Sequence, residues 1–200
     1  MATRIESKQF VSGDFKRQLQ GYGLTTAQIL YRLPDHPALL QTFIWQKFDL
    51  SPEFPELHKF LDDMFESMYA AKGVGLAAPQ IGVGRKIAVI DVSNGERPED
   101  KLVLINPTIV KVDGKQEGEE GCLSIPGFRE QVRRGRSVTI RAQDAKGEVF
   151  EKTGEDLLAR AFLHETDHLY GKLYITHISA LKRDLMKRKI KKLQRAGDWG

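Results

Sequence analysis

The sequence predicts an α+β fold in which antiparallel or mixed β-sheets surround a buried central helix, with a further helix closing the chain. Three observations predict it: β-branched segments occupy the middle of the chain, helical apolar periodicity precedes and follows them, and no internal repeat is present. Strands framed by helices at both ends are typical of α+β proteins. The length of 200 residues suits one domain rather than two.

An amphipathic helix is predicted over residues 55–73. Gly73 ends this segment, as glycine commonly does after a helix. The apolar side chains recur every three or four residues and therefore share one face, which we expect to pack on the core. They are Leu57, Phe60, Leu61, Met64, Phe65 and Met68.

Residues 1–50 predict a helical extension on the N-terminal side of that helix. Short helices are expected over residues 24–33 and 37–46, because prolines interrupt the apolar pattern. The aromatic side chains of the extension argue against a disordered tail. We expect them to pack on the body of the protein or on a second subunit, and the sequence leaves the oligomeric state open.

Strands are predicted between residues 86 and 153, where β-branched runs alternate with Gly, Pro, Asn and Asp. The expected strands are 86–93, 101–110, 137–144 and 147–153. A helix follows over residues 157–170 and ends at Gly171. Its apolar groups spread around much of its circumference, which predicts a buried helix. A basic helix over residues 179–200 closes the chain.

The composition favours a cytoplasmic protein. The single cysteine, Cys122, excludes an internal disulfide and fits a reducing compartment. No segment approaches the ~18 consecutive apolar residues of a membrane span, so no membrane association is expected. The first residues lack the apolar segment of a secretory signal. Much of the excess positive charge lies in the C-terminal helix, where Asp184 is the one acid between Ser179 and Arg195.

The strongest local pattern is His164-Glu165-Thr166-Asp167-His168 in the predicted buried helix. Histidines four residues apart lie on one helix face, so both imidazoles can reach one metal ion. Glu165 is placed where its carboxylate can meet a water molecule at such an ion. The alternative is a pair of core histidines bonded to local carboxylates. Burial raises the odds of a metal site, because two buried histidines and two acids need partners.

A zinc-type catalytic site needs a third protein ligand and one open position. Downstream of the motif only His177 is available, and we expect it to be an ordinary loop residue. Cys122, in the run EGCLS, is the attractive candidate. A free cysteine is more commonly a small buried hydrophobe. The neighbouring Gly121, which permits close backbone approach, favours a site.

A third pattern is GVGLAAPQ, residues 73–80. A phosphate loop is a weak interpretation, because no Lys-Ser/Thr follows and no strand leads directly into the segment. The glycines either turn the chain after the helix or let the backbone come close to a ligand. Gln80 is the one side chain of the segment that can donate a hydrogen bond.

Together, GVGLAAPQ, EGCLS and HETDH resemble the three-motif signature of the peptide deformylase family in order and in separation. The similarity extends over about three quarters of the chain. It implies a peptide deformylase-like fold and a single catalytic domain over residues 1–200. It also implies a metal-dependent hydrolase that removes the formyl group from formyl-methionyl nascent polypeptides and releases formate.

The resemblance further implies roles for individual residues. The implied metal ligands are Cys122, His164 and His168. Glu165 would act as general acid and base, moving the proton of the attacking water to the departing amine. The Gln80 side-chain amide and the Leu123 backbone N–H would stabilise the oxyanion.

For the substrate, the resemblance implies an extended peptide bound to backbone near Val74, Gly75 and Gly121. Its methionine side chain would enter an apolar pocket beside the metal helix, at Arg160 and Ala161. Arg160 departs from relatives that carry an apolar residue here. It either turns its charged end away from the pocket or changes the preferred first side chain.

The metal and the ribosome are the partners that the sequence specifies least. Fe²⁺ is the metal expected in the cell, whereas Zn²⁺, Ni²⁺ or Co²⁺ can occupy the site in purified protein, since ligand type alone does not separate them. The basic C-terminal helix has two interpretations. It is either a solvated face, or a surface that docks on ribosomal RNA through phosphate contacts, as in some relatives.

Three other functions fit part of this pattern. An ordinary HExxH metallopeptidase is disfavoured by a cysteine as third ligand. A structural zinc module that binds the ribosome needs four protein ligands, and only three convincing ones are present. A deformylase-like protein that has lost its activity is disfavoured because the expected catalytic side chains are all present. Action on another formyl amide stays open because of Arg160 and the N-terminal extension.

Overall fold

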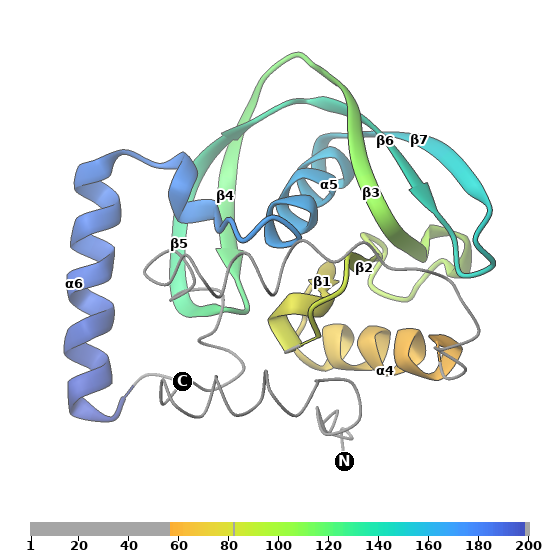
Figure 1. Ribbon diagram of the computed structural model, residues 1–200. Coiled ribbons are helices and arrows are strands. Elements are labelled where there is room, and N and C mark those ends of the chain that lie inside the picture. The colour runs from red at the N-terminus through yellow and green to blue at the C-terminus, as the bar shows by residue number, and fades with distance from the viewer. Residues whose placement is uncertain (1–56, 82, 199–200) are drawn as a thin grey trace.

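The computed structural model describes residues 57–81 and 83–198, and two sheets form its framework (Figure 1). The larger sheet has the strand order β1-β2-β3-β6-β7, and the smaller one is the β4–β5 hairpin. All strand pairs are antiparallel, so the expected α+β fold is confirmed without mixed sheets. The strands are β1 Gly75–Ala77, β2 Ile87–Ile90, β3 Leu102–Asp113, β4 Gln116–Cys122, β5 Ile125–Arg134, β6 Ser137–Gln143 and β7 Val149–Glu155.

Strand β2 lies between two helices, which explains its uninterrupted apolar sequence. Side chains alternate between the faces of a strand. Ile87 and Val89 therefore pack in the cluster around α4 (Leu57–Ala70). Ala88 and Ile90 pack instead in the cluster around α5 (Asp156–His168). The apolar face predicted for the helix over residues 55–73 is confirmed, since all of its apolar residues are buried in α4.

Helix α5 follows β7 without a loop. Asp156 makes this possible by adopting a left-handed backbone conformation, with φ of 47°. Phe162 and His168 are fully buried, which confirms the predicted burial of this helix. Leu157 is an exception, because it lies near the start of the helix and is half exposed. Past the end of α5, Gly171 has a positive φ of 69°, as expected of a glycine that ends a helical segment.

The β4–β5 hairpin runs beside α5 and carries Cys122 near its turn (Figure 1). Its register pairs Gly121 with Arg129, and then Cys122 with Ile125 after an irregularity. The sequence did not predict β1, β4 or β5 as strands. β4 reads QEGEEGC and has no β-branched residue, because most of its side chains are not in the core. β1 has only three residues and lies in the glycine-rich segment.

The C-terminal helix α6 spans Ala180–Ala196, within the predicted range. Its first turn is capped by the Ser179 hydroxyl, which accepts a hydrogen bond from the Lys182 N–H at 3.3 Å. Gly197, with φ of 76°, ends the helix in the left-handed conformation.

Only part of the apolar side of α6 packs against the body. Met186 and Ile190 are buried, and the hydroxyl of the buried Tyr174 contacts the Met186 sulfur at 3.7 Å. Tyr174 belongs to the short 3-10 helix η5 (Tyr174–His177). Leu181 and Leu185, two further apolar residues of this helix, are exposed. The helix lies at one side of the molecule (Figure 1).

The predicted helices at 24–33 and 37–46, and the whole extension over residues 1–50, lie outside the described residues. Further short 3-10 helices, η3 Ala78–Ile81 and η4 Pro98–Asp100, connect the strands. Within the described part of the chain, no helix combines the length and apolar character needed to cross a lipid bilayer.

The carboxylate of Asp91 ties the end of α4 to the end of β2. It is fully buried and accepts hydrogen bonds from the Tyr69 hydroxyl at 2.5 Å and from the Gly95 N–H at 2.9 Å. The N–H and the hydroxyl of Ser93 also donate to it, at 2.8 and 2.7 Å. Burial opposes the charge of Asp91, but these hydrogen bonds outweigh it and hold the pKa of the carboxyl below its usual range.

We expect Asp91→Asn to lower the free energy of unfolding by about 1–3 kcal/mol at neutral pH, since the amide group turns one buried acceptor into a donor. Because the pKa of Asp91 is lower in the folded state, its contribution is present at neutral pH and is lost on acidification. The difference between the wild type and the variant should therefore shrink as the pH falls below about 4. Urea unfolding across this range measures it. The exposed Asp113→Asn serves as control, and an equal effect of both substitutions would contradict the prediction.

Candidate metal centre

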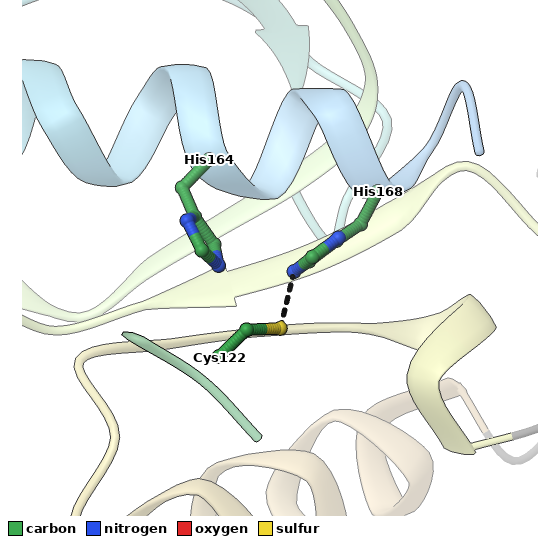
Figure 2. Close-up of side chains that lie close together, drawn as sticks. All are labelled: Cys122, His164 and His168. Atoms are coloured by element: carbon green, nitrogen blue, oxygen red, sulfur yellow. Dashed lines mark hydrogen bonds between the residues drawn. The ribbon is translucent and has the colours of Figure 1, made fainter. Parts of the chain in front are cut away.

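His164 and His168 lie one helical turn apart on α5 and point to the same side, toward Cys122 (Figure 2). Their ring centroids are 4.6 Å apart and the rings meet edge to face. His168 is fully buried, and His164 is nearly so. The i and i+4 spacing in the sequence thus becomes a pair of adjacent imidazoles in a protected place.

Cys122 reaches the two histidines from the end of β4. Its Sγ lies 3.3 Å from the Nε2 atom of His168. The Ser124 N–H also donates to Sγ, at 3.4 Å across the hairpin turn. One ligand atom each from Cys122, His164 and His168 lies within 4.8 Å of the others. The three side chains expected to share a metal ion are therefore brought together, although Cys122 is more than 40 residues from either histidine.

The other ring nitrogens of the histidines are occupied by acceptors. The Nδ1 atom of His164 lies 3.1 Å from the Glu120 carboxylate, and that of His168 lies 3.1 Å from the Lys172 carbonyl oxygen. Each acceptor is satisfied when Nδ1 carries the proton, which leaves Nε2 with a free lone pair. Such backing by carboxylate or carbonyl groups is common for histidines that bind metals.

The electrostatics of the cluster favour a thiolate. Burial opposes the charge of Cys122, but attraction to His168 and His164 outweighs it and holds the pKa of the thiol well below its usual range. Two imidazoles and one thiolate form a donor set that suits zinc and ferrous iron. The residues present therefore fit one divalent ion held by three protein ligands.

Glu165 lies next to this cluster and is buried. Its Oε2 atom has no hydrogen-bond partner among the described residues. Burial raises the pKa of its carboxyl, and attraction to His168 and His164 only partly offsets this. A buried carboxylate oxygen without a partner is costly. Its presence here suggests that a group absent from the structure, such as a water molecule or a substrate, completes the site.

Gln80 approaches the cluster from η3, which follows β1. Its Oε1 atom accepts a hydrogen bond from the Ala77 N–H at 2.8 Å, and this contact orients the amide. The Nε2 atom then points to Cys122 Sγ, 3.6 Å away, and to Ser124 Oγ, 3.3 Å away. The amide can therefore donate into the site. Leu123, the residue after Cys122, is 38% exposed and lies at the edge of the site.

A cavity of about 590 Å³ opens onto this group. Its wall is formed by segments of the helix α5, the strand β1 and the β4–β5 hairpin. The predicted site residues in the wall are Val74, Gly75, Gln80, Gly121, Cys122, Leu123, Arg160, Ala161, His164 and Glu165. His168 is the one predicted site residue outside this wall, and it is fully buried.

The charged end of Arg160 is turned away from the open part of the cavity. Its Nη1 atom donates to Glu120 Oε1 at 2.6 Å and to the Val132 carbonyl oxygen at 3.1 Å. Of the two alternatives for Arg160, this geometry favours the one in which the charged end turns away from the pocket.

A buried ionic network behind the histidines was not predicted. Arg134 donates to both oxygens of Glu120 and, at 2.6 Å, to Asp167. His177, expected to be an ordinary loop residue, bonds to Asp167 at 2.7 Å from the 3-10 helix η5. Glu120 could have been suspected from its place two residues before Cys122. Nothing in the sequence singles out Arg134, which is one of many arginines.

The comparisons with known proteins agree with this geometry. A family model described as polypeptide deformylase matches residues 34–184, about three quarters of the chain. The chain belongs to the polypeptide deformylase family. Members are metal-dependent hydrolases, and the enzyme accordingly removes the N-terminal formyl group of polypeptides.

Individual relatives support the family. A peptide deformylase of Acidobacterium capsulatum is 60% identical over 144 residues, which cover 72% of this chain and 85% of that protein. A peptide deformylase of Alkalilimnicola ehrlichii is 46% identical over 142 residues, covering 71% and 79%. The crystal structure of a peptide deformylase from Legionella pneumophila superposes with a TM-score of 0.70 at 42% identity, covering 81% of this chain and 94% of that one.

The Glu165 carboxylate occupies its position only because residue 75 is a glycine. A Cβ atom on Gly75 would lie 2.3 Å from Glu165 Oε1 and 2.7 Å from its Cδ atom, which is too close for any contact. We expect Gly75→Ala to push the carboxylate out of place and to lower kcat by about 10²-fold, the effect of a displacement of roughly 1 Å in an active site. Formate release under saturating substrate measures the change.

Gly73→Ala is the matched control in the same segment. A Cβ atom there would meet its nearest neighbours at 3.4 Å or more, an ordinary contact. This variant should therefore lose far less activity than Gly75→Ala. Equal losses in both variants would show that the segment tolerates no side chain at all, and that Glu165 is not the reason.

Proposed function

We propose that this enzyme removes the formyl group from the N-terminal methionine of nascent polypeptides with Cys122, His164 and His168 holding one divalent metal ion. The observation that carries the proposal is the convergence of these three donors beside the buried, unpartnered carboxylate of Glu165. Fe²⁺ is the ion we propose for the cell, and Zn²⁺, Ni²⁺ or Co²⁺ for protein purified in air. Such an ion supplies an activated water at neutral pH and polarises the formyl carbonyl group.

Glu165 carries the proton in this proposal. Its carboxylate accepts a proton from the attacking water as the water oxygen bonds to the formyl carbon. When the C–N bond breaks, the same carboxyl group delivers the proton to the departing amine nitrogen, and formate is released. The raised pKa of Glu165 supports this role, because a group that both takes and gives a proton works best when its pKa is not far below the operating pH.

The developing negative charge on the formyl oxygen needs donors. The Gln80 amide, oriented by the Ala77 N–H, is one candidate, and the Leu123 backbone N–H beside Cys122 is the other. Both are held by structure that exists before the substrate binds, so little reorganisation is required.

The substrate peptide would lie extended along the cavity, with hydrogen bonds to the backbone of Val74, Gly75 and Gly121. The position of β1 supports this, because β1 is one of the two edge strands of the larger sheet in the described part of the chain. The methionine side chain would enter beside Ala161 and the stem of Arg160. Since the charged end of Arg160 is bonded to Glu120, we propose that this pocket prefers an apolar side chain.

The basic face of α6 is a proposed ribosome contact. Arg188, Lys191 and Arg195 are exposed on a helix that projects from the body (Figure 1). Exposed cations spaced along one helix can bind the phosphates of ribosomal RNA. Such docking would keep the enzyme in the cytoplasm close to emerging chains.

Replacing Glu165 by Ala should lower deformylation by about 10²–10⁴-fold while the metal stays bound. Cys122→Ala should instead lose the metal and, with it, the activity. The test is formate release from formyl-Met-Ala-Ser by protein prepared anaerobically with ferrous iron, with the metal content of each sample measured in parallel. Near-full activity of metal-loaded Glu165→Ala would exclude the proposed role of the carboxylate.

The triple substitution of Arg188, Lys191 and Arg195 by Gln should weaken co-sedimentation with ribosomes and flatten its dependence on salt. Hydrolysis of the short peptide should be unchanged. The matched control replaces three other exposed cations, namely Lys111 of β3, Arg136 of the turn between β5 and β6, and Arg141 of β6. Equal weakening by both triple variants would indicate a general effect of charge, and no weakening would remove α6 as the contact.

A further inference from the structure

The guanidinium group of Arg160 is part of the support of the candidate metal centre. Arg160 lies on α5 one turn before His164, and its side chain crosses to the β4–β5 hairpin. Besides its bonds to Glu120 and to the Val132 carbonyl oxygen, its Nη2 atom donates to Gln116 Oε1 at 3.3 Å. The side chain is about nine-tenths buried, so these contacts are shielded from solvent.

Glu120 receives four donors, two on each carboxylate oxygen. Oε1 accepts from Arg160 Nη1 at 2.6 Å and from Arg134 Nε at 2.9 Å. Oε2 lies 3.0 Å from Arg134 Nη2 and 3.1 Å from His164 Nδ1. A carboxylate offers about four acceptor positions. All four are therefore used, and the bond to His164 depends on where the two arginines hold the group.

Arg134 and Arg160 differ in the number of carboxylates that each one pairs with. Arg134 also bonds to Asp167, so its positive charge is shared between two carboxylates. Among the described residues, Glu120 is the one carboxylate in an ion pair with Arg160. Without Arg160, the buried Glu120 carboxylate would be paired only with Arg134, whose charge is shared with Asp167. An incompletely paired buried charge is strongly unfavourable. The Glu120 carboxylate would then move toward Arg134, or a water molecule would take the place of the guanidinium group. In either case the alignment of Glu120 with His164 would change.

We propose that Arg160 is a positioning residue for the metal centre: through Glu120 it holds the His164 ring in the orientation that turns Nε2 toward Cys122. The inference rests on the proposed function, because it takes His164 to be a metal ligand. Loss of a group that orients a ligating histidine typically lowers metal affinity or activity by about 10–100-fold. Arg160 acts here through two other side chains and need not touch the substrate.

The strand opposite Arg160 is shaped for its guanidinium group. A Cβ atom on Gly118 would lie 2.9 Å from Arg160 Nη2 and 3.3 Å from its Cζ atom. The atoms in conflict are at the far end of a flexible side chain, so an alanine would displace the guanidinium and leave the strand in place. Gly118→Ala therefore perturbs Arg160 without removing its charge.

The first experiment measures metal affinity by competitive titration with Zn²⁺ and the visible absorption spectrum of the Co²⁺-loaded protein. For Arg160→Met we expect a metal affinity about 10–100-fold weaker, an altered Co²⁺ spectrum, and a lower kcat with little change in KM for formyl-Met-Ala-Ser. Arg160→Lys, which keeps a cation for Glu120, should recover part of the affinity. A raised KM with unchanged metal affinity and spectrum would overturn the proposal and leave Arg160 as a pocket wall.

Gly118→Ala is the second variant, and it decides the question if Arg160→Met does not fold. It should weaken metal binding and alter the Co²⁺ spectrum in the same direction, to a smaller extent. Arg141→Met is the matched control, because Arg141 forms an exposed ion pair with Glu151 away from the site. Wild-type metal affinity and spectrum in folded Gly118→Ala would overturn the proposal.

The outcomes also separate this inference from the proposed function. If the wild-type protein fails to bind one metal ion through Cys122, or fails to release formate, the proposed function is wrong. If the wild type does both while the Arg160 and Gly118 variants keep its metal affinity and its spectrum, only the role of Arg160 is wrong.

Discussion

The site depends on the packing of α5 against the β4–β5 hairpin. Two of the candidate metal ligands come from the helix and the third from the hairpin, and no local geometry relates the cysteine to the two histidines. The elements are held together by a buried ionic network in which Glu120 lies between Arg134 and Arg160. Buried charges demand full pairing. Because the pairing requires specific distances, it restricts the position of the hairpin on the helix more than apolar packing alone would.

The same packing sets the electrostatics of the site. The network provides hydrogen-bond donors for both carboxylate oxygens of Glu120. In contrast, one carboxylate oxygen of the nearby Glu165 has no partner among the described residues. The pKa of the Glu120 carboxyl is accordingly lowered by its partners, whereas burial raises the pKa of the Glu165 carboxyl. Two carboxylates in contrasting environments can take different roles within one small site. Gly75 contributes by leaving room for the Glu165 carboxylate.

The sequence predicted the helices well and the strands in part. The apolar face of α4 and the burial of α5 could be predicted from the local spacing of apolar residues, and the structure confirms both. β4 could not be predicted in the same way, because its polar and glycine residues carry no strand pattern and its pairing with β5 supplies the order. Spacing on a helix does not tell which apolar residues meet a neighbouring element: in α6, Met186 and Ile190 are buried, whereas Leu181 and Leu185 are exposed.

The sequence by itself determined the family and the candidate ligands, because residue types at fixed spacing are enough to identify three motifs and to align two histidines on one helix face. Only the tertiary structure decided how Cys122 reaches those histidines and where the charged end of Arg160 goes. Arg134, Asp167 and His177 are distributed over β5, α5 and η5, and their mutual contacts arise only on folding. The physical reason is that ion pairs and ligand sets depend on distances of a few ångströms, which the order of residues along the chain does not specify.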